Sequence, residues 1–263
     1  MIRSALMNVM TAAAIKAGRG LKRDFGEIEN LQVSSKGPGD FVSLADKRAE
    51  KILFEELSKG RPGYGFVMEE GGRVEGPDKA HTWHIDPLDA TTNFLHAIPI
   101  FAISIALERE GQIVAGVIYN PADDSMYVTE KGQGAWGDNR RLRVAGRTEM
   151  SQALIGCGIP HLGKAAQHPR FKAELSTVMT EVVNVRRLGC ASLDLCFVAA
   201  GRYDAFWERG LNTWDFAAGS LLVREAGGYI TDCDGHPDFM STLSVCAGNE
   251  TMHKQILELL ASA

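Results

Sequence analysis

The sequence predicts an α+β first half, residues 1–146, followed by an α/β second half, residues 147–263. In the first half, helical patterns of apolar residues precede a run of strand patterns, which is typical of helices packed beside an antiparallel sheet. In the second half, short apolar strands alternate with helical segments. No linker rich in Ser, Gly or Pro separates the halves, so we expect them to share an interface.

In the first half, apolar residues within 1–23 recur at helical spacing and predict an N-terminal helix. A second helix is expected to open at Ser43, where Ser43-x-x-Asp46 matches a capping box, and to end at Gly60. A short strand should follow at Phe66–Glu70. The next strand should stop at Asp86-Pro87, because proline cannot continue a central ladder.

Alternating side chains around the turn Glu110-Gly111 predict a hairpin of residues 101–107 and 113–119. Further strands of the first half are expected at 126–129 and 142–144. In the second half, strands are expected at 153–158, 182–187, 203–207, 229–231 and 244–247, with helices near 168–181, 191–200 and 214–226.

Composition argues against several classes of protein. The net charge of −5 disfavours a scaffold that grips nucleic acid through bulk positive charge. No apolar run is long enough to span a membrane. Five cysteines without a C-x-x-C pair fit neither a disulfide framework nor a zinc site, so we expect reduced thiols and a cytoplasmic protein. The sequence also lacks H-E-x-x-H, G-x-S-x-G and P-loop patterns, which disfavours zinc hydrolases, serine hydrolases and P-loop NTPases.

The segment Asp86–Phe94 carries two carboxylates, two hydroxyls and an amide just beyond a predicted strand. Asp86 and Asp89, with a carbonyl between them, could bracket one or two hard cations such as Mg²⁺. Thr91 could cap a following helix whose N-terminus would receive a phosphate. An Asx-rich turn that leads into a capped helix would explain the same residues.

Other acidic residues are ambiguous on their own. Glu69-Glu70 precedes Gly71-Gly72, as in a solvated turn, but a second acidic loop beside Asp86 would complete a cation site. Asp215 and Asp46 each stand in the first turn of a predicted helix, where a carboxylate commonly serves as a cap. Gly189–Ser192 could let a ligand approach backbone amides, or could be a plain strand-to-helix turn.

These residues together resemble the inositol monophosphatase family, most closely its bacterial extragenic-suppressor branch. The resemblance spans nearly the whole chain and rests on four motifs in order: Asp40–Asp46, Glu69-Glu70, Trp83–Phe94 and Trp214–Gly219. It implies a layered αβαβα sandwich of the sugar-phosphatase type. It also implies Mg²⁺-dependent hydrolysis of phosphomonoesters, a homodimer and inhibition by lithium.

The resemblance also implies roles for particular residues. Glu69, Asp86, Asp89, Asp215 and the Leu88 carbonyl would bind metal. Thr91 and Asp46, assisted by Glu69, would activate water. The substrate would contact the backbone of Ala90 and Thr91, the residues Gly189, Cys190, Ala191, Glu208 and Asp215, and more weakly Lys36. Three residues depart from the family pattern: Ala90 and Met68 replace glycines, and Cys190 replaces a common hydroxyl residue.

The sequence therefore predicts a phosphatase for a small polyol phosphate, with myo-inositol monophosphate as the first substrate to test. Fructose 1,6-bisphosphate, a 3′-phosphoadenosine nucleotide and histidinol phosphate are alternatives with the same chemistry. A different class of function is a regulatory binding protein of the transcription machinery, as the resemblance to the extragenic-suppressor branch allows. The complete set of carboxylates favours catalysis.

Overall fold

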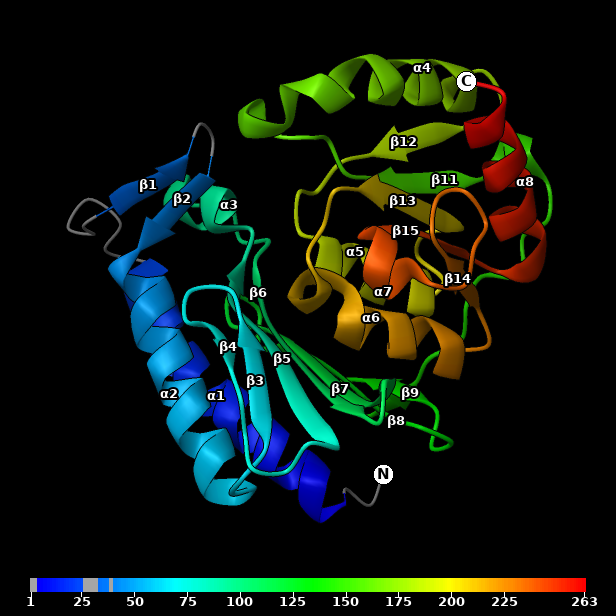
Figure 1. The fold of residues 1–263 in the computed structure, drawn as a ribbon. Coiled ribbons are helices and arrows are strands. Elements are labelled where there is room, and N and C mark those ends of the chain that lie inside the picture. Colours follow the sequence, from blue (N-terminus) through cyan, green and yellow to red (C-terminus); the bar gives the residue numbers. More distant parts are fainter. Residues whose placement is uncertain (1–3, 26–32, 38–39) are drawn as a thin grey trace.

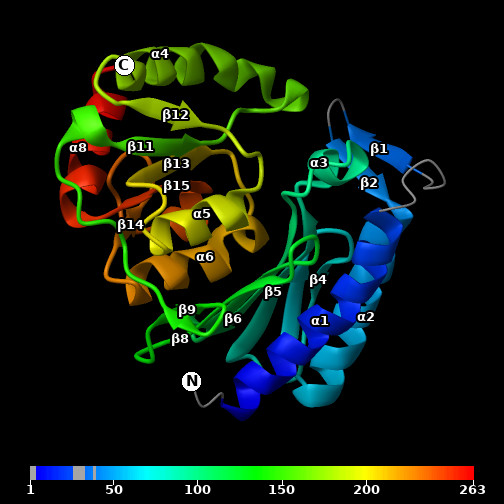
Figure 2. The same ribbon diagram turned by 180° about the vertical axis from the view of Figure 1, so that it is seen from behind.

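The computed structural model describes the backbone of residues 4–25, 33–37 and 40–263, and the side chains of 4–25 and 43–263. Within this part of the chain, helices and sheets stack in five alternating layers (Figures 1 and 2). From one outer face to the other, the helical layers are α1 (Ala5–Phe25) with α2 (Leu44–Gly60), α5 (Ala191–Ala199) with α6 (Thr213–Glu225), and α4 (His168–Met179) with α8 (Glu250–Ala261). This arrangement confirms the predicted αβαβα sandwich.

The first sheet has eight strands in the described chain, in the order β10-β9-β8-β7-β6-β5-β3-β4. Their bounds are β3 Gly65–Met68, β4 Gly72–Val74, β5 His81–Asp89, β6 Ala102–Arg109, β7 Gln112–Asn120, β8 Ser125–Glu130, β9 Ala135–Gly137 and β10 Arg140–Arg141. The predicted hairpin is confirmed as β6 and β7. The expectation of a purely antiparallel sheet is wrong, because β3 and β5 pair in parallel.

The strand β5 does not stop at Asp86-Pro87 as predicted. It continues to Asp89, and its register against β6 shifts between Asp86 and Asp89. Its pairing with β3 ends at Ile85, so Pro87 occupies an irregularity where the missing N–H interrupts no ladder.

The strand predicted at 142–144 is also wrong, since the last strand of this sheet ends at Arg141. The Val144 amide instead donates to the Ala226 carbonyl, at the end of α6. At Val144 the segment therefore bonds to the second half, although the apolar residues of 142–144 predicted a strand of the first sheet.

The second sheet has five strands in the described chain, in the order β12-β11-β13-β15-β14. The bounds are β11 Leu154–Cys157, β12 Asn184–Arg186, β13 Ala205–Arg209, β14 Tyr229–Thr231 and β15 Ser244–Gly248. These strands and α4, α5 and α6 confirm the predicted elements of the second half. The smaller elements are β1 Val33–Gly37, β2 Asp40–Ser43, α3 Thr91–Leu95, α7 Phe239–Thr242 and two 3₁₀ turns, η2 Met150–Gln152 and η3 Leu162–Gln167.

The buried apolar side chains of the described chain form three clusters that follow the layers. One lies between α1/α2 and the first sheet, one surrounds α5 and α6 between the sheets, and one lies between the second sheet and α4/α8. The middle cluster draws on both halves, because α6 packs against β5–β9. None of the described helices has both the length and the apolar content that crossing a bilayer requires.

Candidate active site

A cleft of about 490 Å³ opens between the two halves of the molecule. It is lined by ten of the residues predicted to bind metal, water or substrate: Glu69, Asp86, Leu88, Asp89, Ala90, Thr91, Gly189, Ala191, Glu208 and Asp215. These residues come from β3, β5, α3, α5, β13 and α6 or the loops beside them. The fold thus brings together acids that lie up to 146 positions apart in the sequence.

The parallel pair β3/β5 positions the first two acids. Met68 lies opposite Ile85 in the register, so Glu69 and Asp86 follow at the same end of adjacent strands. The Glu69 amide donates to the Ile85 carbonyl at 3.2 Å. The two carboxyl groups lie close enough for Glu69 to raise the pKa of Asp86. An antiparallel pairing would have placed the two acids at opposite ends.

Electrostatic repulsion dominates this cleft. Burial raises the pKa of Asp86 well above its ordinary value, and the charges of Glu69, Asp89 and Asp215 raise it further. Burial, followed by repulsion from Asp89, also raises the pKa of Asp215 well above the usual range. Burial raises the pKa of Asp89, although hydrogen bonds from Ser192 oppose the shift. Ionised together, these groups are stable only beside positive charge.

Protein donors fix one oxygen of each aspartate. The Leu88 amide donates to Asp86 Oδ1 at 2.9 Å, and the Asn212 amide donates to Asp215 Oδ2 at 2.7 Å. The second bond belongs to a capping box at the start of α6. The structural role foreseen for Asp215 as a cap therefore coexists with its position in the cleft.

The donor set of the cleft fits a hard cation. The predicted ligands are carboxylate and carbonyl oxygens, the type that Mg²⁺ prefers, and His161 is the one imidazole among the lining residues in the described chain. Among the described side chains, no three His, Cys, Asp or Glu groups already stand close enough to hold one ion.

Thr91 and Asp46 form a hydrogen-bonded pair at the edge of the cleft. Thr91 Oγ1 can donate to Asp46 Oδ1 at 3.0 Å or to the Leu88 carbonyl at 3.1 Å. Asp46 is fully buried, and its other oxygen accepts from the amide and hydroxyl of Ser43 in the predicted capping box of α2. The expectation that Thr91 caps the next helix is wrong, since Ala90 is the N-cap of α3 and makes no side-chain cap bond.

The cleft is also lined by Glu208 and by three cations that the sequence analysis missed, Lys164, Arg187 and Arg209. Burial, and then Asp89, raise the pKa of Glu208 to about 8, while Arg187 and Lys164 act to lower it. A methyl group on Gly158 would lie 1.8 Å from the Glu208 carboxyl carbon, so a larger residue there would displace this carboxyl group. Arg187 and Lys164 stand in no recognisable motif, and only the folded chain places them beside Glu208.

Cys190 does not line the cleft. It is fully buried behind Asp89, so its expected direct contact with substrate is replaced by a contact of its Sγ with Asp89 Oδ2 at 3.2 Å. Ser192, which the sequence analysis named only within the turn Gly189–Ser192, also bonds to Asp89. Lys36 lies on β1, and its side chain is outside the described residues.

Comparisons with known proteins agree with this geometry. The model of the inositol monophosphatase family matches residues 3–263. The chain belongs to this family.

An inositol-1-monophosphatase from Mesorhizobium japonicum is 64% identical over 98% of this chain and 97% of its own length. The crystal structure of the extragenic suppressor protein SuhB from Bartonella henselae has a TM-score of 0.95, 54% identity and 98% coverage of both chains. The Nus factor SuhB of Escherichia coli K12 is 38% identical over 96% of this chain and 94% of its own length.

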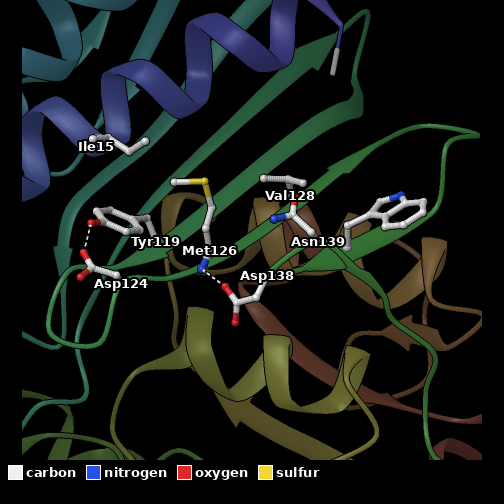
Figure 3. Close-up of a pocket in the computed structure, with 8 residues that line it drawn as sticks. Ile15, Tyr119, Asp124, Met126, Val128, Asp138 and Asn139 are labelled. Carbon is white, nitrogen blue, oxygen red and sulfur yellow. Dashed lines mark hydrogen bonds between the residues drawn. The ribbon is translucent and has the colours of Figure 1, made fainter. Parts of the chain in front are cut away.

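A second pocket, of about 350 Å³, lies beside α1 on the other face of the first sheet (Figure 3). Ile15, Met126 and Val128 line it, and its acids bond within the fold: Asp124 accepts from the Tyr119 hydroxyl and Asp138 from the Met126 amide. It contains none of the predicted site residues. This pocket therefore offers no support for a second site among the predicted residues, ten of which line the acidic cleft.

Two departures from the family pattern differ in consequence. Met68 is buried in the core between α2 and the first sheet and does not line the cleft. Ala90 adopts the left-handed region, with φ 73° and ψ 47°, where a Cβ costs about 1–2 kcal/mol. Glycine at position 90 would avoid this strain, so Ala90 stores strain directly at the lining of the cleft.

Replacing Ala90 with Gly should stabilise the protein by about 0.5–1 kcal/mol, the relief of strain less the greater chain entropy of glycine. Chemical denaturation measures this change. Ala106→Gly, in the buried strand β6 without positive φ, is the matched control and should destabilise by about 0.5–1 kcal/mol. Equal destabilisation by both substitutions would contradict the assigned strain.

Glu208 predicts a pH dependence of stability in the presence of a chelator. Its pKa is about 8 when folded and 4.5 ordinarily, so between these values the folded protein holds a proton that the unfolded chain has released. Stability should therefore fall as pH rises from about 4.5 to 8. Thermal unfolding of Glu208→Gln should show a shallower fall over this window. Parallel curves for the two proteins would refute the assignment.

Proposed function

We propose that this member of a phosphatase family hydrolyses a small polyol phosphate, with Mg²⁺ as cofactor and myo-inositol monophosphate as the first substrate to test. The observation that carries the proposal is the convergence of acids from both halves on one cleft beside the Thr91–Asp46 pair. Such a cleft repels a phosphate dianion unless cations are present, so anionic substrate and cation belong together.

The proposed ligands of Mg²⁺ are the carboxylates of Glu69, Asp86, Asp89 and Asp215 and the carbonyl of Leu88. When bound, Mg²⁺ would supply positive charge that offsets the repulsion between a phosphate monoester and an attacking oxygen. The protein itself must hold these ligands together. The two halves must stay together, because Asp215 comes from α6 and the other ligands come from β3 and β5. We propose that residues 1–146 and residues 147–263 form the two halves of one assembly.

The Thr91–Asp46 pair is proposed to orient the attacking water. When the Thr91 hydroxyl donates to Asp46, its oxygen keeps lone pairs that can accept a proton from water in the cleft. Ser43 donates twice to the buried Asp46, and these two bonds and the bond from Thr91 favour its negative charge. Glu69 would assist from the facing strand end.

The substrate is proposed to lie across the cleft. The backbone amides of Ala90 and Thr91 would meet the phosphate, and Asp215 would contact both metal and substrate. Gly189, Ala191 and Glu208 would face the alcohol portion. With its raised pKa, Glu208 carries a proton near neutral pH and can donate to a substrate hydroxyl. Lys36 remains a proposed phosphate contact from β1.

Myo-inositol monophosphate has the best support among the candidate esters, because the 64% identical relative is named an inositol-1-monophosphatase. Fructose 1,6-bisphosphate, a 3′-phosphoadenosine nucleotide and histidinol phosphate remain alternatives for the same cleft. Phosphate release from a panel of these esters with Mg²⁺ distinguishes them. A folded protein that releases phosphate from none of them would reject the phosphatase proposal.

Three properties complete the proposal. Lithium would inhibit the protein by competing with Mg²⁺ for the proposed cation site. A cytoplasmic location agrees with the five cysteines, all of which lie in the described chain as free thiols. A homodimer, with no nucleic acid or membrane partner, would use exposed apolar side chains such as Leu162, Met179 and Val183.

A regulatory binding protein of the transcription machinery is the second candidate, favoured by the 38% identical relative named Nus factor SuhB. Such a role would use the surface of the molecule and would not need the acidic cleft. The two candidates therefore differ in what they require of Asp89.

Asp89→Asn should lower hydrolysis on the order of a thousandfold, because a metal ligand contributes several kcal/mol to the transition state. Phosphate release at saturating Mg²⁺ measures the loss. Asp138→Asn, an exposed acid in the second pocket, is the control and should retain activity. Hydrolysis by Asp89→Asn at the rate of the control would contradict the proposed site.

A further inference from the structure

Asp89 is held more firmly than the other acids of the cleft. Its Oδ2 accepts from the Ser192 amide at 2.8 Å, from Ser192 Oγ at 2.6 Å and from Cys190 Sγ at 3.2 Å. Oδ1 accepts none of these bonds. All three donors stand at the start of α5, more than 100 positions from Asp89 in the sequence.

The local structure of α5 explains why the donors point to Asp89. Cys190 is the N-cap residue but makes no cap bond with its own side chain. The first amides of a helix need an acceptor, and the Asp89 carboxylate provides it from the end of β5. Asp89 therefore caps a helix in the other half of the protein, and the same contact joins the two halves at the cleft.

The three donors differ in strength. The Ser192 hydroxyl makes the shortest bond, and a hydroxyl bonded to a carboxylate is among the strong hydrogen bonds in proteins. The Cys190 thiol is a weak donor at a longer distance, although burial raises its pKa well above the ordinary value and keeps it protonated. Removal of the Ser192 hydroxyl would therefore leave one strong donor, the backbone amide.

The geometry points to Ser192 as a positioning residue that fixes Oδ2 of Asp89 and so turns Oδ1 toward the cation site. We infer that the Ser192 hydroxyl is the main side-chain donor to Asp89, since the neighbouring Cys190 offers only a weakly donating thiol. The inference rests on the proposed function, because it takes Asp89 as a metal ligand. Residues that orient a metal ligand commonly change metal affinity by about 10- to 100-fold.

The test compares Ser192→Ala with a matched control, Ser220→Ala. Ser220 is also a buried helical serine, but its hydroxyl donates to Ala217 within α6. The readouts are the dissociation constant of Mg²⁺ by calorimetry on the full-length protein, and the Mg²⁺ concentration that gives half-maximal phosphate release. We expect Ser192→Ala to raise both by about tenfold, and Ser220→Ala to leave both nearly unchanged.

Rescue separates positioning from general loss of packing. In the Ser192→Ala background, Cys190→Ser places a hydroxyl beside Asp89 Oδ2 from the other side, and it should recover most of the lost Mg²⁺ affinity. Ser192→Cys keeps a weak donor at the original position and should give an intermediate dissociation constant, which supplies a second test if Ser192→Ala folds poorly.

The inference is overturned if Ser192→Ala binds Mg²⁺ as tightly as the wild type, if the control weakens binding equally, or if Cys190→Ser restores nothing. It is also overturned if the wild type binds no Mg²⁺. A wild type that binds Mg²⁺ with the expected dependence on Ser192 but hydrolyses no ester would reject the proposed function and support the role of Ser192, so the two failures are distinguishable.

Discussion

Repulsion between enclosed carboxylates is the constraint on which the rest of this structure depends. The cleft gathers four acids whose charges raise one another's cost of ionisation: Glu69, Asp86, Asp89 and Asp215. Burial and the neighbouring negative charges raise the pKa of Asp86 and of Asp215 well above the ordinary value. Enclosed carboxylates of this kind lower the stability of the fold. Hard cations bound between them would offset the repulsion and would in turn attract an anion.

In the αβαβα architecture, the acids of the cleft and their hydrogen-bond donors come from both halves of the chain. A parallel strand pair places Glu69 beside Asp86, a capping box orients Asp215, and the start of α5 holds Asp89. Each contact also stabilises secondary structure, so the same residues stabilise the fold and orient the carboxylate oxygens of the cleft. Because Asp89 bonds to Ser192, the same contact joins the end of β5 to the start of α5 and orients an acid of the cleft.

Much of this could be predicted from the sequence where the signal is local. Capping at Ser43, the turn at Glu110-Gly111 and the alternation of strands and helices in the second half are properties of neighbouring residues. The parallel pairing of β3 and β5 and the passage of β5 through Pro87 depend on partners distant in sequence, so no local pattern revealed them. In the cleft, motifs identified the acids, whereas Arg187, Lys164 and the bonds from Ser192 to Asp89 became apparent only in the folded chain. Cys190 matched a motif position, but its burial changed the role expected of it.

The most direct test is an anomalous-scattering map from crystals grown with Mn²⁺ in place of Mg²⁺. Both ions favour oxygen ligands, and Mn²⁺ can be located without ambiguity. The account predicts anomalous peaks within coordination distance of Glu69, Asp86, Asp89 and Asp215. A cleft without Mn²⁺ at saturating concentration, with ions bound only elsewhere on the molecule, would contradict it.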